Sequence, residues 1–176
     1  MVLRHSPKQF IIFLVFVLVG VMVHYPSFRL SLYGDDWLTI YLYFVPSHDQ
    51  ARFGPLPGVL SFLTPYGPSI LLIGSLYRIF STNYIFYYVI ALALRLFTTF
   101  ALYLASSKFT KDYLISFLVS LLFLVGFTGL QTPDWVFYMN VYLALGLFLL
   151  GLFYKAKFLE TKKNKDLSLS CFLDAL

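Results

Sequence analysis

Two adjacent carboxylates, Asp35 and Asp36, are the residues of this sequence best suited to acid–base chemistry. They stand between a glycine and Trp37, shortly after the first long apolar run. Because each carboxylate beside an apolar surface disfavours the charge of the other, one of them could act as a general base near neutral pH. The pair could also hold a divalent cation through its oxygens. Alternatively, Gly-Asp-Asp could form a turn that Trp37 anchors at a membrane interface.

Asp134 belongs to a second element that joins an acid to a tryptophan, Thr132-Pro133-Asp134-Trp135. This segment also fits a tight helical hairpin, in which Thr132 or Asp134 caps a helix and Trp135 lies at an interface. Two elements that each join an acid to a tryptophan favour a functional role more strongly than either element does alone.

Arg95 is the third candidate, because it lies near the middle of a long apolar run. A guanidinium at that depth is costly unless it faces protein or a water-filled cavity. It could pair with a helix of this or another chain, or it could bind a lipid phosphate. Asn140 favours a hydrogen bond between helices. His24 and His48 have no partner at metal-ligand spacing.

The composition places these residues in a membrane protein. Hydrophobic residues make up 60% of the chain and charged residues 12%, and long runs with few charges indicate membrane spans. The net charge of +5 arises from basic residues that flank the apolar runs, which argues against a nucleic-acid interface. The single cysteine, Cys171, cannot form an internal disulfide.

The apolar runs predict an all-α membrane protein with about four transmembrane helices. Residues 26–82 are rich in proline and are expected to form a long outer loop with short interfacial helices, among them Trp37–Phe44 and a half-length helix over Ile70–Phe80. The first run is interpreted as an uncleaved helix, because no small-residue cleavage site follows it. The predicted spans are residues 10–25, 84–105, 113–130 and 136–154.

The basic residues predict the orientation of these spans. Most of them fall in residues 1–9, 106–112 and 155–176, so both termini are expected in the cytoplasm. The protein is expected in the plasma (inner) membrane. The acids Asp35, Asp36 and Asp134 then share the outer side.

The order of these elements resembles the N-terminal part of GT-C-type membrane glycosyltransferases, over about residues 5–155. Relatives of that type include the protein O-mannosyltransferases and the lipid-A aminoarabinose transferases. The residues that carry the resemblance are the early Asp-Asp-Trp, the aromatic half-helix over 65–80, Leu94-Arg95-Leu96 and the segment 131–137.

The resemblance implies transfer of a sugar from a polyprenyl-phosphate donor to an acceptor hydroxyl at the outer face of the cell envelope membrane. It implies that Asp35 or Asp36 is the catalytic base. Asp134 would assist the acceptor or, with Asp36, a divalent cation, and Arg95 is the candidate for the donor phosphate.

Enzymes of this type usually carry more spans. The chain is therefore expected to be an N-terminal part that packs with further transmembrane helices, and the basic tail 155–176 ends like the start of another apolar helix. The alternative function is a small non-catalytic membrane protein, either an assembly subunit or a transporter-like scaffold. In that case the acids are turn residues, and Arg95 pairs with another subunit.

Overall fold

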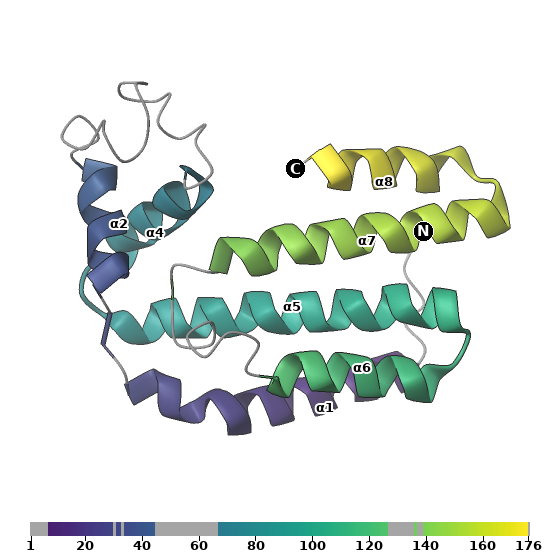
Figure 1. The fold of residues 1–176 in the computed structure, drawn as a ribbon, viewed down its shortest axis with the longest axis horizontal. Helices are drawn as coiled ribbons and strands as arrows, with labels where there is room; N and C mark the ends of the chain where they lie inside the picture. Colours follow the sequence, from purple (N-terminus) through teal and green to yellow (C-terminus); the bar gives the residue numbers. More distant parts are fainter. Residues whose placement is uncertain are drawn as a thin grey trace. The chain divides into compact units, whose positions relative to one another are not determined.

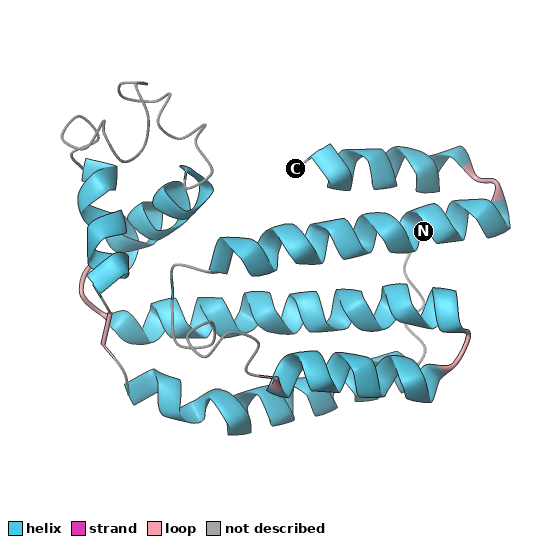
Figure 2. Cartoon of the chain, viewed as in Figure 1, coloured by secondary structure: helices cyan, strands magenta, loops and turns pink. Residues whose placement is uncertain are grey.

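The computed structural model describes residues 7–29, 31–32, 34–44, 67–126, 136 and 139–175. Within these ranges the chain is helical apart from short turns and contains no strand, so the predicted all-α class is confirmed (Figure 2). The elements are α1 (Pro7–His24), the 3-10 helix η1 (Tyr25–Arg29), α2 (Gly34–Phe44), α4 (Gly67–Phe80), α5 (Tyr84–Thr110), α6 (Tyr113–Val125), α7 (Met139–Thr161) and α8 (Asn164–Ala175) (Figure 1).

The chain divides into two compact units. The first unit comprises Met1–Tyr25, Leu92–Thr128 and Val141–Leu176. The second comprises Pro26–Ala91 and Gly129–Asn140.

Three of the described helical segments are long and apolar enough to cross a membrane: Lys8–Arg29, Tyr84–Thr110 and Met139–Thr161. They coincide with three of the four predicted spans. Helix α6, over the remaining predicted span 113–130, has 13 residues and is about 20 Å long, which is less than the ~30 Å hydrocarbon core of a bilayer. It ends at Val125 instead of residue 130, because Gly126 leaves the helical conformation and caps it.

The first unit has an apolar exterior and places small polar side chains inside. The hydroxyls of Thr99 and Ser120 are fully buried, and each donates to the carbonyl oxygen four residues earlier in its own helix, at 2.8 and 2.9 Å. Hydroxyls satisfied in this way are tolerated where helices pack without water. The exposed apolar side chains of α1 and α6 include Phe10, Ile11, Leu18, Met22, Leu114, Leu118 and Leu122.

The apolar core of the first unit joins α1, α5 and α6. Its buried members are Phe16, Leu96, Tyr103 and Leu124. The ring of Phe16 stacks on that of Phe117, with 5.4 Å between the centroids.

The second unit contains the pair formed by α2 and α4. The side chains of Ile40, Ile70 and Ile73 are buried, and the edge of the Trp37 ring meets Tyr77 at a centroid distance of 6.4 Å. The helices expected over residues 37–44 and 70–80 are confirmed. Each begins earlier than predicted, α2 at Gly34 and α4 at Gly67.

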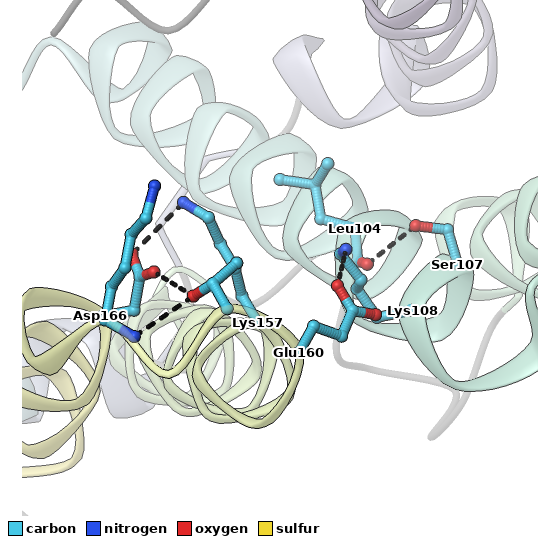
Figure 3. A network of polar contacts seen from close by, with 8 residues as sticks. Leu104, Ser107, Lys108, Lys157, Glu160 and Asp166 are labelled. Atoms are coloured by element: carbon cyan, nitrogen blue, oxygen red, sulfur yellow. Dashed lines mark hydrogen bonds and ion pairs between the residues drawn. The ribbon is translucent and has the colours of Figure 1, made fainter.

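Helix α8 folds back along α7 in the first unit. Ser170 Oγ donates to the Gly151 carbonyl oxygen at 3.0 Å. Asp166 accepts a hydrogen bond from Thr161 Oγ1 at 3.1 Å and pairs with Lys157 Nζ at 3.2 Å (Figure 3). The predicted basic tail thus consists of the last turns of α7 and a further helix.

The attachment of α8 is expected to depend on pH. Burial acts to raise the pKa of Asp166, but the hydrogen bonds from Lys157 and Thr161 and the charge of Lys157 hold this pKa below its ordinary value. The stabilisation by ionised Asp166 is therefore complete above the ordinary Asp pKa and is lost as pH falls through the lowered one. On acidification the wild type should lose more thermal stability in detergent than Asp166→Asn does. Equal losses in the two proteins would contradict this prediction.

Candidate functional site

Arg95 forms the centre of the best-defined polar site in the first unit. Its side chain is 3% exposed. Nη1 donates to the Tyr142 hydroxyl of α7 at 2.9 Å. Nη2 donates to the carbonyl oxygens of Phe123 and Gly126, at the end of α6, at 3.0 and 2.7 Å.

The end of α6 explains why a cation lies there. The last carbonyl groups of a helix have no partner within it, and they form the negative end of its dipole. The Gly126 amide donates to Leu122 O at 2.7 Å, and His24 Nε2 lies 3.1 Å from Leu124 O. Arg95 provides donors for two further carbonyls, so α1 and α5 together satisfy the buried end of α6.

Two aromatic rings flank the guanidinium. The Arg95 Cζ atom lies 5.8 Å from the centroid of the Phe123 ring and 5.4 Å from that of Tyr142. Both distances permit a cation–π attraction. A second polar contact joins α5 to α7, since the Thr98 hydroxyl lies 2.5 Å from the Tyr142 carbonyl oxygen.

These contacts give Arg95 a structural role within this chain. The sequence alone had left open whether its partner would be a helix of this chain or of another subunit. Sequence reasoning missed Tyr142, whose only sequence signal is a phenol placed in an apolar span. His24, which had no metal partner in the sequence, is a buried hydrogen-bonding residue. The assignment of a donor phosphate to Arg95 stays a prediction.

Asp36 is a buried acid of the second unit. It lies in the first turn of α2 and is 1% exposed. Thr39 and Ile40, at the i+3 and i+4 positions, are buried as well, so the three residues share one face of the helix. The expected alternative of a Gly-Asp-Asp turn is therefore replaced by a helix start, where acidic residues are favourable.

The segment before α2 is tied to the start of α5. The Tyr88 hydroxyl donates to the Ser31 carbonyl oxygen at 3.0 Å. This bond fixes the backbone a few residues ahead of Asp36, within the second unit. An ionised carboxylate can accept a proton from a group that reaches it, which is the requirement for a general base.

The remaining candidates are only partly described. Asp35 lies in the same helical turn as Asp36, but its side chain lies outside the described residues. Asp134, with Thr132 and Trp135, lies outside them entirely. Asn140 is the second residue of α7, and its Oδ1 atom is buried without a hydrogen bond among the described residues.

Asp36 and Arg95 belong to different units. No group of three His, Cys, Asp or Glu side chains that could hold a metal ion occurs in the described part of the chain. A divalent cation held by Asp36 and Asp134 stays a prediction, because Asp134 lies outside that part.

No family model, curated protein or solved structure matches this chain.

Proposed function

We propose that this chain is a GT-C-like membrane glycosyltransferase, or its N-terminal part, which transfers a sugar from a polyprenyl-phosphate donor to an acceptor hydroxyl at the outer face of the plasma membrane. The observation that carries the proposal is the position of Asp36. It is a buried carboxylate in the first turn of a helix, and that helix follows the first candidate membrane span. A buried acid that follows a candidate membrane span in the sequence is a functional candidate on physical grounds.

The reaction needs a base and stabilisation of a leaving phosphate. Asp36, or Asp35 beside it, takes the proton of the acceptor hydroxyl as the hydroxyl oxygen attacks the anomeric carbon of the donor. The bond from that carbon to the phosphate oxygen breaks, and polyprenyl phosphate leaves with the bonding electrons. A cation stabilises the charge that develops on the phosphate. Within the second unit, a divalent cation that Asp36 and Asp134 would hold is the candidate for this role. The assignment of Arg95 of the first unit to the phosphate stays a prediction from the sequence.

The test of the proposal is the donor class that the protein accepts. The longest natural form, reconstituted in liposomes, would receive polyprenyl-phosphate-linked sugars or nucleotide-linked sugars, each labelled in the sugar. We expect transfer from the lipid-linked donor with release of polyprenyl phosphate. Transfer from the nucleotide-linked donor alone, or from neither, would contradict the proposal.

The proposed topology has four spans with both termini in the cytoplasm. On a Cys171→Ser background, single cysteines at Ser47, Ser107 and Thr132 should react with a membrane-impermeant thiol reagent from the outside, the inside and the outside, respectively. Ser107 decides the result, because it lies near the end of α5 beside the basic connector. Reaction of this cysteine from the outside would exclude the four-span arrangement.

The contacts of Arg95 favour a second candidate function, a non-catalytic membrane scaffold. Its hydrogen bonds to α6 and α7 hold three helices of the first unit together. A scaffold needs that structural role and no donor site. Binding of a polyprenyl phosphate to the purified protein distinguishes the two candidates. A transferase should bind it more tightly than a phospholipid, whereas a scaffold should bind the two lipids equally.

A further inference from the structure

A cleft of about 330 Å³ opens in the first unit, where the end of α5 meets the start of α6. Its polar lining comes from Gln9 of α1, Ser107 and Lys108 of α5, Lys111 of the connecting turn, and Glu160 of α7. Three helices and a turn thus place polar groups around one opening. The volume is at the small end of the range of ~300–1,000 Å³ typical of ligand sites.

The lining carries one excess positive charge. Lys108 Nζ and Glu160 Oε2 form an ion pair at 2.7 Å (Figure 3), so these two charges offset each other. Lys111 is exposed and has no ion pair among the described residues. Because one lysine is left over, the cleft is complementary to a single negative charge.

The wall of the cleft also contains apolar and aromatic side chains. Leu104 and Phe153 are half-buried, and Tyr113 is 70% exposed. Leu104 and Phe153 belong to α5 and α7, which are long and apolar enough to cross a membrane. Tyrosines are enriched where such helices leave the hydrocarbon and meet the headgroups. The cleft therefore combines a polar opening with an apolar wall at one end of two candidate spans.

We infer that this cleft binds the headgroup of an anionic phospholipid, with the phosphate facing Lys111. Basic clefts between membrane helices are suited to such headgroups, because lysine attracts the phosphate while the apolar wall contacts the acyl chains. The amide of Gln9 can donate a second hydrogen bond to a phosphate oxygen. The Ser107 hydroxyl already donates to Leu104 O at 2.8 Å (Figure 3), so it offers the ligand only its lone pairs. The inference is independent of the proposed transferase function.

The backbone of the chain offers a matched pair of variants. Lys111 and Lys162 both adopt a positive φ of 55° in a turn that ends a long helix. Asparagine tolerates this conformation better than most residues, so replacing either lysine by Asn removes one charge without straining the turn. Lys111 lines the cleft and Lys162 does not.

The experiment is native mass spectrometry of the whole chain in a non-ionic detergent, titrated with short-chain phosphatidylglycerol. Parallel arms contain phosphatidylcholine of the same chain length, or inorganic phosphate as a competitor. We expect one phosphatidylglycerol to bind in preference to phosphatidylcholine. Lys111→Asn should weaken this binding by about fivefold, the effect of one lysine on anionic lipid, whereas Lys162→Asn should leave it unchanged.

Three outcomes would overturn the inference. Equal weakening in both variants would show that overall charge, and not the cleft, attracts the lipid. Equal binding of the two lipids would exclude recognition of the negative headgroup. Displacement by inorganic phosphate at the same concentration would show that the cleft takes a free anion instead of a lipid.

Discussion

Replacement of Asp36 by Asn is expected to reduce sugar transfer by about 10²–10⁴-fold, the usual contribution of a general base. Asn keeps the size of the side chain but cannot take the proton of the acceptor. The rate is measured with the labelled polyprenyl-phosphate donor, and the amount of protein in the membrane is measured in parallel. A wild-type rate of sugar transfer in this variant would exclude Asp36 as the base and would leave Asp35 as the candidate.

Thr39→Val is the matched control for this variant. Thr39 lies on the same buried face of α2, one turn after Asp36. The substitution removes a buried hydroxyl from the same helix face without removing a carboxylate. Transfer should therefore persist in Thr39→Val. If both variants lose transfer to the same degree, the loss reports a damaged helix and not a missing base.

Arg95→Leu is expected to lower the free energy of unfolding by about 2–4 kcal/mol. The substitution leaves the Phe123 and Gly126 carbonyls without their charged donor in a buried site, and each unsatisfied group costs about 1–3 kcal/mol. Removal of the buried charge offsets part of this cost. Arg95→Lys keeps the charge but loses the planar guanidinium that reaches α6 and α7 together. Its free energy of unfolding should therefore fall by less than that of Arg95→Leu.

The measurement is thermal unfolding of the variants in detergent. Tyr142→Phe serves as the control, because it removes one acceptor of the Arg95 guanidinium and keeps the ring beside it. It should be less destabilised than Arg95→Leu. A Leu variant as stable as the wild type would contradict the structural role of Arg95.

The same variants separate that structural role from donor binding. If Arg95 also binds the donor phosphate, Arg95→Lys should stay folded and bind polyprenyl phosphate less tightly. If its role is structural only, Arg95→Lys should bind the lipid as the wild type does.

The long helices could be predicted from the sequence because their signal is local. Long apolar runs predicted α1, α5 and α7, and the short aromatic segments predicted α2 and α4. The helix ends were less predictable. Gly126 lies within a long apolar stretch, so its role as the cap of α6 appears only in the structure.

The partners of Arg95 could not be predicted, because two of them are backbone carbonyls. Every residue has a carbonyl, and only the place where α6 ends decides which ones need a donor. The sequence could show that a mid-span arginine must face protein or water. It could not show that the partner would be the end of a helix of the same unit.

The most direct test of the proposed function compares the wild type with the double variant Asp35→Asn/Asp36→Asn in the longest natural form. Both proteins would be reconstituted at equal amounts, and sugar transfer from the labelled polyprenyl-phosphate donor would be measured. We expect clear transfer by the wild type and, because no neighbouring carboxylate can replace the lost base, transfer at background level by the double variant. Equal transfer by the two proteins would contradict the catalytic role of this acidic pair.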